Sequence, residues 1–160
     1  MAESGLQKLV VHNANNPHVF GLDAREVFFL DDRVLVFEGQ EDVVFWPSVH
    51  KDFQAAYNLY GWGAGGASNI RWVLELLRDL GFEKVAAILD SDRAADVEQL
   101  SLAFPTYFTR AIEAPDIRTK KATAAKAQKL GLLNDRKEVR PEYAEATNSL
   151  LCELTNFMSS

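Results

Sequence analysis

The stretch KVAAILD, Lys84 to Asp90, decides the fold class of this chain. It is almost entirely apolar, which is typical of a central parallel strand that is covered on both faces. RVLVFE, Arg33 to Glu38, predicts a second strand rich in β-branched residues. Between the two, apolar side chains recur at helical spacing from Ile70 to Leu80 and stop at Gly81. Strands that alternate with helices predict an α/β fold with a mainly parallel sheet.

Further elements are expected on both sides of this unit. Pro47 interrupts a helical pattern from Glu41 to about Tyr57, and it either kinks that helix or restarts it. Ser68 or Asn69 is expected to cap the helix after the glycine-rich stretch. The remaining expected elements are strands at 26–30, 56–60 and 106–112, a helix over 120–130, and a last helix that Pro141 opens, with Tyr143, Leu150, Leu151, Leu154 and Phe157 inward. The prediction is a sheet of about four strands flanked by helices, with a C-terminal helical extension.

Length and charge narrow the class of protein. The 160 residues suit one domain with an appendage. A formal net charge of -6 gives no overall attraction to nucleic acid, so such binding needs a basic patch or a bound metal. The single cysteine, Cys152, cannot form an internal disulfide and is expected to be buried. The N-terminal residues carry no signal peptide or membrane span, so a cytoplasmic protein without membrane contact is expected.

Carboxylates follow two of the apolar strands. Glu38 comes directly after VLVF, close to the core, where a charge needs a partner. Asp90 and Asp92 follow the central strand, and residues two apart in an extended chain point the same way. A DxD pair alone is a weak signal, but with Glu38 several carboxylates would converge on one sheet edge and repel one another without a cation. Hard oxygen ligands suit Mg²⁺ or Mn²⁺. Glu41, in contrast, is explained by its favourable charge at a helix N-terminus.

The stretch GWGAGG contains GxGxxG, the fingerprint of dinucleotide-binding proteins, at Gly61, Gly63 and Gly66. Asp90 lies near the spacing expected of a ribose-binding acid. The fingerprint normally follows the first strand, however, and here a strand ending in EGQED precedes it. A dinucleotide-binding protein therefore remains a minor alternative.

The order of these motifs resembles the Toprim domain of topoisomerases, primases and related nucleases. Glu38-Gly39 and Asp42 follow one apolar strand, and ILDSD follows another. Over about residues 33–121, the series RVLVFEGQEDVVF, GWGAGGASNI, LLRDLGF, ILDSDRA and APDIRTKK is similar to the OLD-family (overcoming lysogenization defect) nucleases. In that family the Toprim domain follows an ABC-type ATPase domain.

The resemblance implies a role for each matching residue. Glu38 would be a metal ligand and a candidate general acid or base. The other implied metal ligands are Asp42, Asp90 and Asp92, and Ser91 could add an oxygen. The glycine loop would lie beside the metal site, so that the backbone at Gly63, Gly65 and Gly66 approaches the acids or a phosphate.

A basic segment follows the last expected strand of the sheet. From Ile117 to Leu133 there are five cations and no acid: Arg118, Lys120, Lys121, Lys126 and Lys129. DIRTKK should emerge at the same sheet edge as the acids, where a lysine can stabilise charge that develops on a phosphate. Lys120 is favoured over Lys121 for this role. Lys121 is the neighbouring phosphate-binding candidate, and Arg118 would hold a phosphate or pair with Asp116.

The sequence therefore predicts a metal-dependent DNA endonuclease or nickase that uses one or two Mg²⁺ or Mn²⁺ ions. The alternative within the same fold is a Toprim module that binds nucleic acid or a partner without cleaving. Residues 1–30 would be the flank of an ATPase domain in cis, 31–121 the Toprim catalytic domain and 122–160 the helical extension; a homodimer is a further possibility. The chain has no GxxxxGK[ST] motif, so no nucleotide is expected to bind it through a P-loop, and the scattered His12, His18 and His50 give no zinc spacing.

Overall fold

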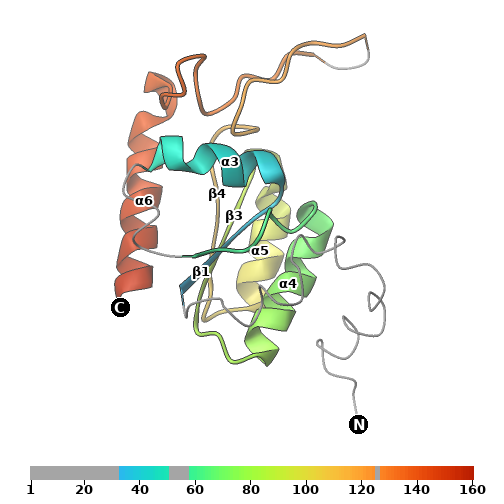
Figure 1. Cartoon of the computed structure of the whole chain (residues 1–160), viewed down its shortest axis with the longest axis vertical. Coiled ribbons are helices and arrows are strands. Elements are labelled where there is room, and N and C mark those ends of the chain that lie inside the picture. Colours follow the sequence, from blue (N-terminus) through green and yellow to red (C-terminus); the bar gives the residue numbers. More distant parts are fainter. Residues whose placement is uncertain (1–32, 51–57, 125–126) are drawn as a thin grey trace.

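A computed structural model describes residues 33–50, 58–124 and 127–160 of the chain (Figure 1). The strand expected at 26–30, the N-terminal flank, His12 and His18 lie outside the described residues. The described strands are β1 (Arg33–Phe37), β2 (Asn58–Leu59), β3 (Lys84–Leu89) and β4 (Phe108–Ala111). The α-helices are α3 (Gln40–Val49), α4 (Ala67–Asp79), α5 (Ala94–Ala103) and α6 (Ala144–Ser159). Two short 3₁₀ helices, η3 (Ser91–Arg93) and η4 (Pro141–Tyr143), precede α5 and α6.

The four strands form one all-parallel sheet in the order β2-β1-β3-β4. The chain moves outward from β1 to β2, then crosses back over β1 to reach β3 and β4. This reversal makes the β1–β3 pair a topological switch point, because the connections that leave the two strands lead to opposite faces of the sheet. In doubly wound sheets of this kind, the crevice at the carboxyl ends of the two switch strands is where ligands bind.

Helices cover both faces of the sheet, so the structure has three layers. α3 and α6 pack on one face, where they bury Trp46 and Leu154 against Leu35 and Phe37 of β1. α4 and α5 pack on the other face, against the alternate residues of the same strands, as Figure 1 shows. Both faces of β1 and β3 are therefore buried, which explains their nearly continuous apolar sequences. The α/β fold with a parallel four-stranded sheet, predicted from the sequence, is confirmed.

α4 ends as the sequence predicts, but it begins earlier than expected, at Ala67. The N–H of Phe82 donates to the carbonyl of Leu77 and the N–H of Gly81 to that of Arg78, which is the Schellman arrangement expected with a glycine at this position. The residue before the first helical residue is Gly66, and it makes no side-chain cap. The expectation of a Ser68 or Asn69 cap was wrong, because the glycine loop turns directly into the helix.

Three other predictions of local structure were wrong. α3 runs through Pro47 but stops at Val49, where His50 is extended, so one helix does not continue to Tyr57; residues 51–57 lie outside the described part. The described residues of 120–130 are not helical: Lys120 and Lys129 pair as an antiparallel bridge. Cys152 is exposed, because α6 buries a face that contains Leu150, Leu154 and Met158 instead.

The glycine loop between β2 and α4 packs on the backbone that follows β1. The N–H of Ala64 donates to the carbonyl of Phe37 at 2.8 Å, and the N–H of Gly66 donates to that of Glu38 at 2.8 Å. Gly63 has a φ of +87°, and a Cβ on it would lie 2.7 Å from the carbonyl carbon of Gly39. The glycines thus allow two backbone segments to touch at the end of the β1 strand.

Gly63→Ala should destabilise the fold more than Gly81→Ala does. Both positions have positive φ, but a Cβ at Gly81 meets nothing within 4 Å, so alanine there adds conformational strain alone, roughly 1–2 kcal/mol. Alanine at Gly63 adds the collision with Gly39, for a total of about 2–5 kcal/mol. Urea unfolding of the two variants measures the difference, and equal losses would show that the contact with Gly39 is not tight.

Candidate functional site

Glu38 lies where β1 ends, directly beside the end of β3. The two strands pair in parallel register, with Phe37 opposite Ile88. Oε1 of Glu38 therefore accepts the backbone N–H of Asp90 across the strand pair at 3.1 Å. Only 15% of the Glu38 side chain is exposed, and this burial raises its pKa against the lowering effects of that N–H and of Arg93. The backbone N–H of Asp90 is thus the partner that a carboxylate so close to the core requires.

Asp90 carries the most perturbed carboxylate of the described residues. Its side chain makes no hydrogen bond or ion pair with the described part of the chain, although its backbone is held by Glu38. Burial, and then the charges of Asp42, Glu38, Asp116 and Asp92, raises the pKa of Asp90 to about 8. A carboxylate without a counter-charge, at the switch point of a parallel sheet, is the kind of group that marks a functional site.

Asp42 joins the two acids from the first turn of α3. Its Oδ2 accepts the N–H of Gly39 at 3.0 Å, which is the reciprocal half of a capping box. Burial raises the pKa of Asp42 to about 6; the Gly39 N–H opposes this rise, and the charges of Glu38 and Asp116 add to it. One oxygen of Asp42 therefore organises the loop after β1 while its charge acts on the other acids.

Asp116 is a fourth acid, and the sequence reasoning considered it only as a partner for Arg118. It follows β4, and the neighbouring Ala114 carbonyl accepts the N–H of Ser91 at 3.1 Å, which ties the loop after β4 to the loop after β3. Asp116 raises the pKa of both Asp42 and Asp90. An acid in the loop after the next parallel strand was the available signal, because parallel strands bring their carboxyl ends to one edge.

The DxD pair does not have the extended geometry that the sequence reasoning assumed. Ser91, Asp92 and Arg93 form η3, so the backbone turns after Asp90. Half of the Asp92 side chain is exposed, and its carboxylate pairs with Lys129 at 3.1 Å and with Arg93 at 3.8 Å. The expected extended conformation of this stretch was therefore wrong, and the Asp92 carboxylate is paired with two cations.

The basic segment meets the acidic edge through Lys120. Its Nζ pairs with Glu41 and lies 3.5 Å from Oδ2 of Asp116. Burial lowers the pKa of Lys120, but the bond to Glu41 and the charge of Asp116 outweigh burial and raise it. Lys120 is therefore a full cation beside the acids. The segment that carries it is placed by Gly131, where a Cβ would lie 2.1 Å from the backbone of Arg118.

Glu41 and Arg93 are two charged residues whose roles the sequence did not reveal. Glu41 binds Lys120 and, at 2.5 Å, Nη2 of Arg118, so it does more than favour a helix N-terminus. Arg118 uses its guanidinium for Glu41 and only its backbone N–H for Asp116, at 3.2 Å. Arg93 lies 4.0 Å from Oε2 of Glu38 and 3.7 Å from Asp96. The pairs of Glu41 and the Arg93–Glu38 contact join residues far apart in the chain, so the order of residues does not specify them.

The glycine loop offers fewer free donors than the sequence suggested. The N–H of Gly63 donates to the carbonyl of Tyr60 at 3.1 Å, and that of Gly66 to the carbonyl of Glu38. Both donors are thus used within the fold. Contact of this loop with a phosphate stays a prediction for Gly65, which is exposed and has no backbone partner for its N–H among the described residues.

The oxygen donors of the acids suit a hard divalent cation, but their arrangement in this structure does not form a metal site among the described residues. Within residues 33–50, 58–124 and 127–160, no three His, Cys, Asp or Glu side chains are arranged to hold one metal ion. The carboxylates of Glu38, Asp42, Asp90 and Asp116 nevertheless act on one another electrostatically, and that of Asp90 lacks a partner in these segments. Oxygen donors of this type suit Mg²⁺ or Mn²⁺, so these four residues are the ones that would hold it.

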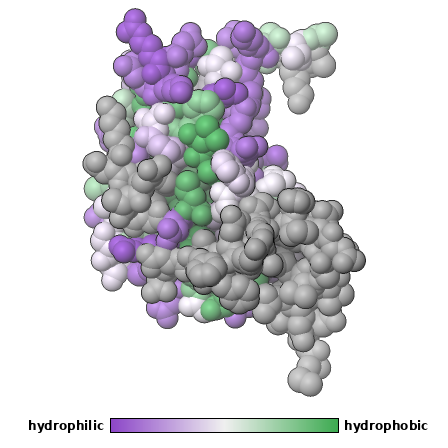
Figure 2. Space-filling view, in the orientation of Figure 1, coloured by the Kyte–Doolittle hydropathy of each residue, from purple (hydrophilic) through white to green (hydrophobic). Residues whose placement is uncertain are grey.

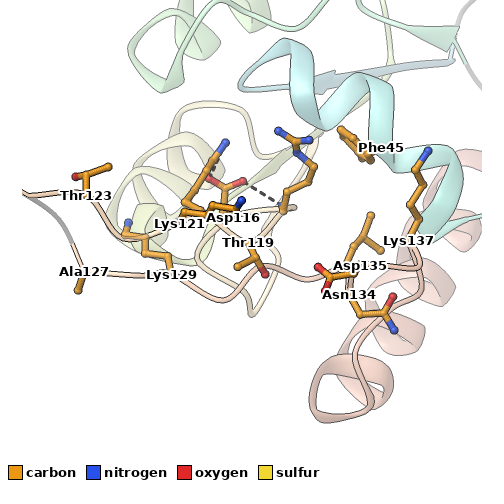
Figure 3. A pocket seen from close by; sticks show the side chains of 13 residues that line it. Phe45, Asp116, Thr119, Lys121, Thr123, Ala127, Lys129, Asn134, Asp135 and Lys137 are labelled. Atoms are coloured by element: carbon orange, nitrogen blue, oxygen red, sulfur yellow. Dashed lines mark hydrogen bonds and ion pairs between the residues drawn. The ribbon is translucent and has the colours of Figure 1, made fainter.

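A cavity of about 850 Å³ opens beside the acidic edge. Figure 3 shows Asp116, Lys121 and Lys129 on one side of it and Phe45 with Lys137 on another. Its lining also contains Lys120 and Arg118. In the space-filling view of Figure 2, hydrophilic residues gather at the end of the molecule that carries the segment after β4, above a hydrophobic band. The acids and the basic cavity are therefore neighbours.

Comparison of the chain with protein-family models, with curated proteins and with solved structures gave no match. Among the helices of the described segments, none combines the length and the apolar character that crossing a membrane requires.

Asp90→Asn should stabilise the metal-free protein above about pH 6. The pKa of Asp90 is raised in the fold to about 8, so the folded state keeps a proton that the unfolded state, with a pKa near 3.9, gives up. This contribution to stability is complete below about pH 4 and is lost as pH rises to 8. Asparagine removes the loss, and the free energy of unfolding at pH 8 should rise by roughly 1–3 kcal/mol, discounted for partial exposure.

Asp92→Asn is the matched control, because that carboxylate is half exposed and already paired with Lys129. It should leave stability unchanged or slightly lower at every pH. Thermal melts in a chelating buffer from pH 4 to pH 9 measure both variants. A lower melting temperature for Asp90→Asn at pH 8 would show that the Asp90 charge is compensated.

Proposed function

We propose that this chain is a Toprim-like, metal-dependent nuclease domain that hydrolyses phosphodiester bonds in DNA. The observation that carries the proposal is the meeting of Glu38 and Asp90 at the β1–β3 switch point, with Asp42 and Asp116 beside them and no counter-charge on Asp90 in the described residues. The parallel sheet agrees with the fold that the resemblance implied. Function itself is inferred from the acids, because fold alone does not determine it.

Each group has a part in this chemistry. A divalent ion, when bound, would lower the pKa of a bound water and neutralise charge on the phosphate. Glu38 and Asp90 would hold it from the ends of two strands that cannot separate without breaking the sheet. Asp42 and Asp116 would complete the oxygen set. Lys120, which is already a cation beside Asp116, would stabilise negative charge on the phosphate oxygens during the reaction.

One observation favours a non-cleaving Toprim-like module as a second candidate. Lys120, Lys129 and Arg93 already pair with acids of the edge or of its margin, and the described side chains form no ready-made metal set. A module that uses the edge for binding needs no metal. The dinucleotide-binding alternative gains no support, because the N–H groups of Gly63 and Gly66 are used inside the fold.

Glu38→Gln and Asp90→Asn should each lower plasmid cleavage in Mg²⁺ or Mn²⁺ by about 100-fold or more, because both variants keep the shape of the side chain and remove a negative oxygen ligand. The control is Asp79→Asn, since Asp79 lies at the far end of α4 and pairs with Arg78.

Thermal melts with and without metal give a second readout: wild type should gain stability on adding Mn²⁺ and the two site variants should not. Equal cleavage by wild type and both site variants would refute the nuclease; metal stabilisation with no cleavage of any DNA would favour the non-cleaving module.

Lys120→Gln should lower kcat by roughly 100-fold and leave the metal-induced rise in melting temperature in place, because the lysine is proposed to act on the phosphate and not on the metal. Lys121→Gln is the matched comparison, one residue further along the same segment and without an ion pair to the described acids; its kcat should fall by less than about 5-fold, because a phosphate contact of Lys121 would act on substrate binding. Steady-state cleavage of a fluorescent oligonucleotide measures both. A larger loss for Lys121→Gln would exchange the roles of the two lysines.

A further inference from the structure

The cavity beside the acidic edge concentrates positive charge in an acidic chain. Among the described residues, five cations line it, against the two acids Asp116 and Asp135: Arg118, Lys120, Lys121, Lys129 and Lys137. The whole chain has a formal net charge of -6. A local excess of cations in a concave site raises the local concentration of anions. The cavity is therefore set apart electrostatically from the rest of the molecule.

The cations of the cavity differ in how they are held. Arg118 and Lys120 pair with Glu41, and Lys129 pairs with Asp92. Lys121 and Lys137 form no ion pair with the described residues, so two charges in the lining are free to meet an anion. Figure 3 places Lys121 and Lys137 on different sides of the cavity.

Lys137 occupies a position that normally belongs to glycine. Leu133 and Val139 pair as an antiparallel bridge, and the N–H of Lys137 donates to the carbonyl of Asn134 at 3.0 Å. Within this turn Lys137 has a φ of +60°, the only positive φ at a non-glycine residue in the described segments. Hairpins of this kind place glycine or asparagine at the left-handed residue. A strained conformation kept by a lysine points to a use for its side chain.

The turn places Lys137 over the ring of Phe45. The side-chain oxygen of Asn134 accepts the N–H groups of Arg136 and Glu138, at 2.8 and 3.0 Å, which fixes the loop. Nζ of Lys137 lies 5.7 Å from the centre of the Phe45 ring, and the Arg118 guanidinium lies 4.6 Å from it. The cavity thus combines cations with flat groups, the combination that binds the phosphates and the bases of a single strand.

The cavity leads to the proposed catalytic edge. Asp116 and Lys120 line it, and the same Asp116 acts on Asp90. Its volume of about 850 Å³ lies within the range of sites that hold small organic ligands. That range accommodates a few nucleotides of one strand and not the width of a duplex.

We propose that this cavity binds a single strand of nucleic acid and directs it to the acidic edge, with Lys137 and Lys121 contacting phosphates and the Phe45–Arg118 pair contacting a base. The proposal rests on the proposed function and deepens it, because it names the form of the substrate. Free nucleotides share the phosphate chemistry, so the experiment must separate them from a strand.

The test is fluorescence anisotropy of a labelled oligonucleotide with the full chain in a chelating buffer, where no cleavage occurs. The single strand should bind at least about 10-fold more tightly than the duplex of the same sequence, and free ATP should compete only weakly. Lys137→Asn should weaken single-strand binding by about 3–10-fold and reduce the salt dependence by nearly one phosphate contact, with an unchanged or higher melting temperature because asparagine tolerates the left-handed conformation.

Arg136→Ala is the matched control: it removes the same charge from the same turn, but Arg136 does not line the cavity. Its binding should equal that of wild type.

Equal effects of the Lys137 and Arg136 variants would overturn the proposal, and so would tighter binding of the duplex or of ATP. Binding as expected, with no cleavage after metal is added, would refute the nuclease and leave the strand site standing. If the wild type cleaves DNA but Lys137→Asn binds the single strand normally, the strand site would be refuted and the nuclease would stand.

Discussion

Parallel pairing of β1 with β3 brings the carboxylate of Glu38 to the backbone N–H of Asp90, 3.1 Å away, and the rest of the candidate site depends on this contact. The chain leaves β1 toward the face covered by α3 and leaves β3 toward the face covered by α5. In sheets of this topology, ligands bind at the carboxyl ends of two such strands. Both strands are buried on both faces, so the two acids follow directly on segments of the core.

Gathering acids at this edge has an energetic cost that the fold offsets only in part. Burial and mutual repulsion raise the pKa of Asp42 and of Asp90 to about 6 and about 8. Arg93 of η3 and Lys120 and Lys129 of the segment after β4 bring counter-charge, but none of them pairs with Asp90. A core that served stability alone would place a neutral residue there. Uncompensated charge of this kind is characteristic of sites that bind a cation or hold a proton.

The glycine loop shows how position in a sheet changes the meaning of a motif. GWGAGG matches the dinucleotide fingerprint as a pattern, yet it follows the edge strand β2. Its amides extend the hydrogen bonding of β1 beyond the strand, and Gly63 leaves room for the backbone of Gly39. The loop therefore supports the turn that carries Glu38 and Asp42. Its glycines are needed for contact between two backbones, which is a steric requirement that holds with or without a ligand.

The sequence by itself determined the parallel α/β fold, the strands that end in Glu38 and Asp90, and the glycine stop of α4, because burial and helix capping are written in local composition. Only the tertiary structure decided which charges meet: Glu41 with Lys120, Lys129 with Asp92, and Asp116 with the edge. It also decided that the described residues of the lysine-rich segment after Asp116 are not helical, because Gly131 packs on Arg118 and Lys120 bridges Lys129. Such contacts join residues distant in the chain, and periodicity within one segment carries no information about its partner.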